Sequence, residues 1–336
     1  MPNMPTRKIG NDQVPEIGLG AMGLSSFYGS VGTDEERLKL LDAAYEMGCT
    51  FWDTADIYGD SEELIGKWFK RSGKRDEIFL ASKFGFDRKT LNSANGNPKY
   101  AEESLERSLS RLGVDHIDLY YLHRADAKVP IETTVGAMSK MVKEGKVRYI
   151  GLSEISGSTL KRAHAVHPIS AVQVEYSPFA LDIEDEKIAL LKTCRELGVP
   201  VVAYSPLGRG LLTGRYRSLD DFEPEDFRRQ IPMRNFDKIM TLVENIKGIA
   251  DKHNATPAQV SLAWLLAQGN DIFVIPGTKK VQYLKENVGA AKVHISKEEE
   301  SEIRAYAKKA LDVSHGPRYP KAMMDLLFVE TPPLKT

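Results

Sequence analysis

Residues 49–68 read CTFWDTADIYGDSEELIGKW, and this stretch introduces the pattern that the rest of the chain follows. Its first four residues are apolar enough for a buried strand, and a helical pattern starts at Ser61. The loop between them carries a carboxylate, Asp53, at the strand end and a phenol, Tyr58, five residues later. A carboxylate leaving a buried strand is unfavourable without a cationic partner. The stretch therefore predicts a strand–loop–helix unit with a cation close to Asp53.

The same alternation of apolar runs and amphipathic helices recurs along the chain. Strands are predicted at residues 17–20, 50–53, 78–83, 117–122, 147–152, 171–174, 199–203 and 272–275. Helices are predicted from Thr33 onward and at 61–70, 99–112, 131–143, 157–166, 185–197, 237–252 and 256–268. Strand–helix alternation implies a parallel sheet. Eight such units favour an α/β fold of the (β/α)8 TIM-barrel type, although the pattern alone also fits an open doubly wound sheet.

Three segments lie outside this alternation. Residues 7–9 and 14–17 predict an N-terminal hairpin turned at 10–12. Residues 207–236 form a long Gly-, Arg- and Asp-rich loop after the seventh strand, which we expect to be functional or mobile. Two extra helices follow it. Because no linker of Gly, Ser or Pro character divides the chain, we expect one domain over 1–336, with a core of 15–312 and a tail of 313–336.

Composition excludes several classes of function. Basic and acidic residues number 46 and 47, which gives a net charge of −1. Nucleic acid and anionic membranes select proteins with a basic excess, so we expect neither as a partner. Cys49 and Cys194 are expected to be reduced and buried. Residues 1–7 lack the apolar segment of a signal peptide, and we expect a soluble cytoplasmic enzyme.

Residues 18–23 read GLGAMG, which formally matches the G-x-G-x-x-G dinucleotide fingerprint. That motif requires a hydrophobic strand before it and a helix that opens inside it. The upstream residues are partly polar, and the next helix is expected only at Thr33, where Glu36 would complete a capping box. We therefore interpret the glycines as a first barrel strand that leads into a loop close to a ligand.

Polar side chains follow the apolar runs, and in a barrel of this kind the active site lies at these carboxyl ends. The strand-end residues are Asp53, Ser82, Lys83, His123, Arg124, Ser153, Glu154, Gln173, Glu175, Tyr204, Ser205, Thr278, Lys279 and Lys280. Any one strand must meet water eventually, so a single polar end carries little information. Seven such ends that converge on one face predict a functional site.

Lys83 is the natural partner for Asp53, and a purely structural ion pair is the alternative. A free tyrosine has a pKa of about 10. We expect the Lys83 ammonium to lower the pKa of Tyr58, so that the phenol can donate its proton to an oxygen that is becoming an alkoxide. His123 is expected to hydrogen-bond the same oxygen, whereas a lone histidine is more often a satisfied core residue.

The end of the eighth strand has the character of an anion site. Lys279 and Lys280 lie in the first turn of a predicted helix, where cations oppose the helix dipole unless an anion binds. Two solvated surface lysines are the alternative. Residues 205–210 are expected to cradle a second phosphate, Tyr204 to stack on a flat ring, and Ser153 and Gln173 to hydrogen-bond an amide. Together these features describe a nicotinamide dinucleotide across the barrel mouth.

In these motifs the sequence resembles the aldo-keto reductases over nearly its whole length. The resemblance rests on residues 53–59, 81–85, 121–124, 147–153, 173–177, 204–210, 275–280 and 286–287. It implies the catalytic residues Asp53, Tyr58, Lys83 and His123. The cofactor-binding residues that it implies are Gly20, Met22, Asp53, Ser153, Gln173, Tyr204, Ser205, Leu207, Gly208, Arg209, Gly210, Gly277, Thr278, Lys279, Lys280, Glu286 and Asn287. It implies no metal.

The sequence departs from the family pattern at two positions. Glu154 stands where many members have Asn, and Tyr283 stands where many have Arg near the adenine end, which weakens the case for a 2′-phosphorylated cofactor. Residues 208–214 resemble the fungal, plant and bacterial subgroup that includes pyridoxal reductase-like enzymes. The residues expected to line a partly aromatic substrate pocket are Phe27, Tyr28, Phe84, Phe86 and Arg124.

The resemblance implies NADPH-dependent reduction of an aldehyde or ketone to an alcohol, with NADP+ as acceptor in the reverse direction and NADH less favoured. A small carbonyl compound is the expected partner, and the oligomeric state is not readable from the sequence. A cofactor-binding sensor or channel-associated regulatory subunit with little turnover is the alternative. A hydrolase would require a metal cluster or a carboxylate pair, and neither occurs among the strand ends.

Overall fold

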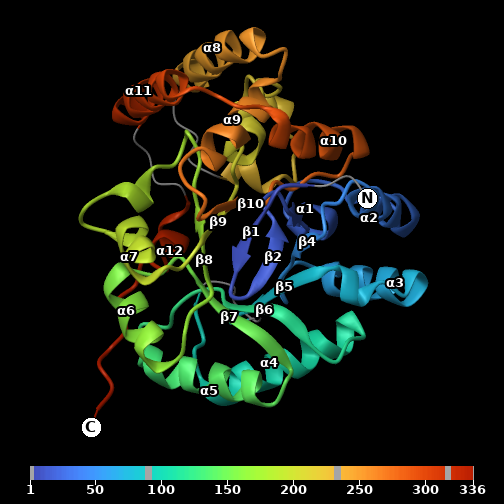
Figure 1. Ribbon diagram of the computed structural model, residues 1–336, viewed down its shortest axis with the longest axis vertical. Helices are drawn as coiled ribbons and strands as arrows, with labels where there is room; N and C mark the ends of the chain where they lie inside the picture. Colours follow the sequence, from blue (N-terminus) through green and yellow to red (C-terminus); the bar gives the residue numbers. More distant parts are fainter. Residues whose placement is uncertain (1–3, 88–92, 231–235, 315–318, 336) are drawn as a thin grey trace.

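The computed structural model describes residues 4–87, 93–230, 236–314 and 319–335. Its centre is a sheet of eight parallel strands, each hydrogen-bonded to the next along the chain (Figure 1). These strands are β3 (Leu19–Gly20), β4 (Phe51–Asp53), β5 (Phe79–Phe84), β6 (Ile117–Leu122), β7 (Val147–Ser153), β8 (Ala171–Glu175), β9 (Val201–Tyr204) and β10 (Ile272–Val274). The predicted strands are confirmed, with shifts of one or two residues at most ends.

The first and last strands meet and close the sheet. Gly18 N donates to Val274 O at 2.8 Å, and Val274 N donates to Glu16 O at 2.9 Å. Parallel bridges join Ile17 to Val274 and Gly20 to Gly277. The structure is therefore the predicted (β/α)8 barrel, and the open doubly wound sheet is excluded.

Helices surround the barrel on its outer face (Figure 1). They are α2 (Asp34–Glu46), α3 (Ser61–Ser72), α4 (Pro98–Leu112), α5 (Ile131–Lys143), α6 (Gly157–Val166), α7 (Leu190–Leu197), α8 (Phe236–Lys252), α9 (Pro257–Leu266), α10 (Val281–Gly289) and α11 (Lys297–Ser314). The capping box predicted at Thr33 with Glu36 forms, and a second capping box joins Thr256 and Gln259 at the start of α9. The two extra helices, α8 and α9, follow the long loop as expected.

Two helix predictions are corrected. The helix expected at 185–197 begins only at Leu190, because the Asp185 carboxylate accepts from Lys187 N at 2.7 Å and Ala189 is left-handed, with φ of 50°. Such a side-chain turn replaces the first helical turn. A short helix, α1 (Met22–Ser25), opens inside the glycine-rich motif, where none was expected before Thr33.

The N-terminal hairpin closes one end of the barrel. Its strands, β1 (Thr6–Ile9) and β2 (Asp12–Pro15), pair antiparallel, and in Figure 1 they lie across the centre of the molecule. Ile9 and Val14 are fully buried against inward-facing side chains of the strands, which include Phe51 and Phe273. This apolar plug leaves the opposite, carboxyl ends of the strands to form a site.

Strand alternation places the polar strand ends inside the barrel. Asp53 follows Phe51 by two residues, Lys83 follows Ala81, Gln173 follows Ala171 and Tyr204 follows Val202. The four apolar residues belong to the barrel interior. Because side chains two apart on a strand share a face, the four polar residues also face inward, at the end away from the hairpin.

The long loop and the tail both reach this end of the barrel. The described part of the loop contains three 3₁₀ turns, η3 (Gly208–Thr213), η4 (Leu219–Asp221) and η5 (Phe227–Gln230). Phe227 N donates to Phe27 O at 2.9 Å, and in the tail, which includes α12 (Lys321–Met324), Phe328 N donates to Glu154 O at 2.8 Å. Residues 231–235 of the predicted long loop and 315–318 of the predicted tail lie outside the described residues.

Within the described part of the chain, no helix is long and apolar enough to cross a membrane. Both cysteines are free and buried, as expected.

Candidate active site

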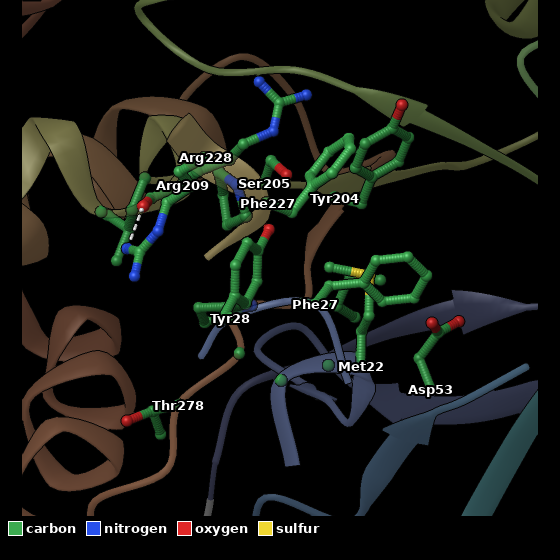
Figure 2. A pocket seen from close by; sticks show the side chains of 18 of the residues that line it. Met22, Phe27, Tyr28, Asp53, Tyr204, Ser205, Arg209, Phe227, Arg228 and Thr278 are labelled. Carbon is green, nitrogen blue, oxygen red and sulfur yellow. Dashed lines mark hydrogen bonds between the residues drawn. The ribbon is translucent and has the colours of Figure 1, made fainter. Parts of the chain in front are cut away.

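A cavity of about 500 Å³ opens at the carboxyl ends of the strands. Its volume is within the range of small-molecule sites. Figure 2 shows its wall, which combines side chains from the loop after β3, the ends of β4 and β9, the long loop and the segment after β10. The labelled residues include Phe27, Tyr28, Asp53, Tyr204 and Arg228, which come from distant parts of the sequence.

A buried ion pair lies at the base of the cavity. The Lys83 ammonium bonds to one carboxylate oxygen of Asp53 and donates to Thr54 O at 2.7 Å. Gln173 Nε2 donates to the other Asp53 oxygen at 2.7 Å. Burial raises the pKa of Asp53 and lowers the pKa of Lys83, while the attraction between the two charges opposes both shifts. Hydrogen bonds thus hold both charged groups in one orientation.

Tyr58 is held over this ion pair by its own loop. Asp56 N donates to Lys83 O at 3.1 Å, which ties the loop to β5. Gly59 then turns with φ of 56°, and a side chain there would begin 2.7 Å from Ser25 O. The result places the Tyr58 ring in the cavity wall with its centroid 5.0 Å from the Lys83 ammonium.

The expected lowering of the Tyr58 pKa is wrong for this structure. Burial, together with the Asp53 carboxylate, raises the pKa of Tyr58 well above 10, and the opposing effect of Arg124 is smaller. The reason is that the phenol is only 9% exposed, so that desolvation of its charged form exceeds the effect of nearby cations. Tyr58 is therefore fully protonated at neutral pH, which is the state that a proton donor requires.

His123 lies next to Tyr58. The two ring centroids are 5.8 Å apart with an interplanar angle of 84°, and Phe86 packs edge-on against the imidazole at 4.8 Å. Burial, with Arg124 and Lys83, lowers the pKa of His123 well below 6.5. Its Nδ1 is buried and has no hydrogen-bond partner among the described residues. The imidazole is thus neutral at neutral pH and carries one N–H that can be donated to a ligand.

The opposite end of the cavity is rich in cations. Lys279 Nζ donates to Tyr28 O at 2.6 Å and to Ser30 O at 2.9 Å. Lys280 and the buried amide of Asn287 line the same wall. Both carbonyls that hold Lys279 are uncharged, so the ammonium keeps its charge available to an anion. This end fits a phosphate group, and the aromatic end at Tyr204 fits a flat ring.

Tyr283 occupies the position where the resemblance leads one to expect Arg, and the structure brings another arginine to it. The Arg215 guanidinium lies 3.6 Å from the centroid of the Tyr283 ring. It also forms an ion pair with Glu286. The long loop thus supplies an arginine beside the position at which the local sequence has tyrosine.

Glu154 and the tail position Tyr204. The Tyr204 hydroxyl donates to Glu154 Oε1 at 2.7 Å and lies 3.1 Å from the Tyr319 hydroxyl. The same Glu154 oxygen accepts from Glu175 N at 2.9 Å. Glu154 is fully buried, so it shapes the wall from behind and does not line the cavity.

Most residues predicted for the site line the cavity. They are Gly20, Met22, Phe27, Tyr28, Asp53, Tyr58, His123, Arg124, Gln173, Tyr204, Ser205, Leu207, Arg209, Gly210, Gly277, Thr278, Lys279, Lys280, Glu286 and Asn287. Lys83, Ser153 and Gly208 lie behind the wall. Ser153 Oγ accepts from Arg124 Nη1 at 3.3 Å.

Phe84 does not belong to the pocket. It is fully buried in the hydrophobic core and stacks on Tyr120 with ring centroids 5.2 Å apart. The reason is strand alternation, since the neighbouring Lys83 faces inward and Phe84 must therefore face the helices. Phe86, beyond the end of β5, lines the cavity instead.

Several cavity residues were not predicted individually. Arg215, Tyr216, Phe227 and Arg228 come from the long loop, and Tyr319 comes from the tail. The only sequence signal for the first four was the unusual length of their loop. Among the described residues, no group of three or more His, Cys, Asp or Glu side chains could hold a metal ion.

Known proteins are similar to this chain in sequence and in fold. The model of the Aldo/keto reductase family matches residues 16–308. The chain is 59% identical over 339 residues to aldo-keto reductase str7 of Strobilurus tenacellus, covering 98% of this chain and 99% of that protein. It is 52% identical over 340 residues to aldo-keto reductase yakc, named with NADP(+), of Schizosaccharomyces pombe, covering 99% of both.

A solved structure of a thermostable aldo-keto reductase, Tm1743, in complex with the inhibitor epalrestat is also similar. It superposes with a TM-score of 0.75 at 32% identity and covers 90% of this chain and 100% of its own.

Proposed function

Because the chain belongs to the aldo/keto reductase family, we propose that it catalyses the NADPH-dependent reduction of an aldehyde or ketone to an alcohol. One observation carries the proposal. The Tyr58 phenol lies in the cavity wall, with the Lys83 ammonium 5.0 Å from its ring centroid and the centroid of the His123 ring 5.8 Å from it. A proton donor (Tyr58), a cation (Lys83) and a neutral hydrogen-bond donor (His123) thus lie close together.

In this proposal, bound NADPH supplies a hydride to the carbonyl carbon. Tyr58 donates its proton to the carbonyl oxygen, so that hydride and proton together convert C=O into CH–OH. The Lys83 ammonium stabilises the phenolate that Tyr58 leaves behind, and Asp53 keeps Lys83 oriented. The neutral His123 donates a hydrogen bond that orients the carbonyl oxygen.

The residues of the cavity fit NADPH along its length. Tyr204 offers a ring face for the nicotinamide, and Gln173 lies beside it for the carboxamide, with Ser153 behind the wall. Residues 205–210 and 277–280 would hold the phosphates, together with Gly20 and Met22. Lys279, Lys280 and Arg215 would bind a 2′-phosphate. The NADP(+) in the name of the yakc relative supports the choice of NADPH over NADH.

The proposal is tested by mixing the protein with NADPH and para-nitrobenzaldehyde and following the loss of reduced-nicotinamide absorbance. Tyr58→Phe is expected to lower kcat by about 10²- to 10⁴-fold, the usual contribution of a general acid. Tyr306→Phe, which removes a hydroxyl on α11 that donates to Glu302 at the surface, is the matched control and should keep the wild-type rate. Equal rates for wild type and Tyr58→Phe would exclude the proposed role of Tyr58. NADPH binding without turnover on any carbonyl would instead favour a cofactor-binding regulatory subunit.

A further inference from the structure

Arg124 is a buried cation in the cavity wall whose hydrogen bonds within the described part of the chain all go to uncharged groups. It directly follows His123, lines the cavity and is 5% exposed. Its Nη1 donates to His123 O at 2.7 Å and to Ser153 Oγ at 3.3 Å, and the guanidinium lies 5.4 Å from the centroid of the Phe86 ring. These contacts orient the guanidinium, but none of them neutralises it.

The other arginines of the cavity wall each form an ion pair with a carboxylate of the protein. Arg209 pairs with Glu175 at 2.9 Å, Arg228 pairs with Asp226 at 2.6 Å, and Arg215 pairs with Glu286. Arg124 forms no ion pair with any carboxylate among residues 4–87, 93–230, 236–314 and 319–335. It therefore differs from these arginines in having no carboxylate partner among the described residues.

The guanidinium stays charged in this position. Burial alone would lower the pKa of Arg124, but Tyr204 and the Glu154 carboxylate, with smaller contributions from Tyr319 and Tyr58, hold it above the ordinary value. Glu154 itself is engaged elsewhere, since its Oε1 accepts from Tyr204 and from Glu175 N. A buried charge without a directly bonded counter-ion is unfavourable, and an anion that enters the cavity would relieve that state.

We propose that the carbonyl substrate carries a carboxylate group, which the Arg124 guanidinium binds while the carbonyl oxygen lies between Tyr58 and His123. The inference rests on the proposed reductase function and narrows it to the reduction of oxo-acids. A guanidinium offers parallel N–H donors that match the two oxygens of a carboxylate. The rings of Phe86 and Phe27, which line the same cavity, fit the apolar part of the substrate between the two groups.

The first experiment compares two substrates that differ in charge, para-carboxybenzaldehyde and its methyl ester. The ratio kcat/KM is measured with each substrate for wild type, Arg124→Gln and Arg124→Lys. Wild type should prefer the acid, and Arg124→Gln should lose about tenfold to hundredfold more activity toward the acid than toward the ester, the effect of one charged hydrogen-bonding group. Arg124→Lys should recover part of the loss. Arg195→Gln removes an equal charge from an exposed pair with Asp271 and should leave the acid-to-ester ratio unchanged.

The second experiment does not depend on turnover. Calorimetry with benzoate and methyl benzoate, in the presence of NADP+, is expected to show tighter binding of benzoate to wild type and a selective loss of that binding in Arg124→Gln. If wild type binds or reduces the ester as well as the acid, the inference is overturned while the reductase function stands. If no aldehyde is reduced but benzoate binding depends on Arg124, the anion site stands and the proposed function fails.

Discussion

The Tyr204 hydroxyl donates a 2.7 Å hydrogen bond to the buried carboxylate of Glu154. Glu154 directly follows β7 and has a left-handed φ of 50°. This backbone conformation turns its side chain behind the cavity wall. A short hydrogen bond to a carboxylate is among the stronger contacts in proteins. The contact therefore gives the Tyr204 ring one orientation before any ligand binds.

This relationship predicts that the ring, and not the hydroxyl, provides most of the NADPH affinity at this position. Tyr204→Ala should weaken NADPH binding by about 1–3 kcal/mol, the range measured for aromatic stacking on a base. Tyr204→Phe keeps the ring and should retain most of the affinity. The dissociation constants follow from quenching of protein fluorescence. Equal losses in both variants would mean that the ring does not stack on the nicotinamide.

The buried ion pair predicts a large effect on stability. Lys83→Met should lower the free energy of unfolding by about 3–5 kcal/mol, because it leaves the Asp53 carboxylate buried without a cation. The double variant Asp53→Asn/Lys83→Met should recover part of that loss, since no charge remains. Urea unfolding measures both. A single variant as stable as wild type would show that the pair contributes nothing to the fold.

His123 predicts a pH dependence of stability. Its pKa in the folded protein is well below 6.5 because of burial, Arg124 and Lys83. The unfolded chain therefore binds more protons than the folded one as the pH falls below about 6.5, and stability is lost in that direction by up to about 1.4 kcal/mol per pH unit. Above that pH this group contributes no slope.

The matched variant is His123→Gln, which keeps a side-chain N–H but does not titrate. The difference in unfolding free energy between wild type and this variant, measured from pH 7.5 to pH 5, cancels the contribution of the carboxylates. This difference should be constant above about pH 6.5. Below that pH, wild type should lose stability relative to His123→Gln. A difference that stays constant over the whole interval would mean that His123 titrates normally.

The cationic end of the cavity predicts a preference for NADPH over NADH. Lys279→Ala/Lys280→Ala should weaken NADPH binding at least about tenfold more than NADH binding, since only NADPH carries a 2′-phosphate. Arg215→Ala tests separately whether the cation stacked on Tyr283 replaces the arginine missing at that position. Dissociation constants for both nucleotides decide the matter. An unchanged ratio in both variants would place the phosphate elsewhere.

The sequence predicted the polar residues at the carboxyl ends of the strands whose side chains point into the barrel. Phe51 and Asp53, or Ala81 and Lys83, are two residues apart, and the period of two that makes a strand amphipathic also states which polar residues share a face. Parallel strands bring their carboxyl ends to one side, so Asp53, Lys83, His123 and Gln173 could be assigned to one site without coordinates. The same alternation directs Phe84 to the core, so its expected place in the pocket conflicted with the pattern that located Lys83.

The sequence by itself determined the strand–helix repeat, the barrel as the favoured closure, the capping boxes and the polar ends of the strands, because each depends on residues close together in the chain. Only the tertiary structure decided that Glu16 and Gly18 pair with Val274 to close the sheet, that Arg215 reaches Tyr283, and that Tyr319 reaches Tyr204. It also decided that the pKa of Tyr58 rises, since desolvation depends on everything packed around the phenol. Contacts and burial of this kind join segments far apart in the chain, and no local pattern encodes them.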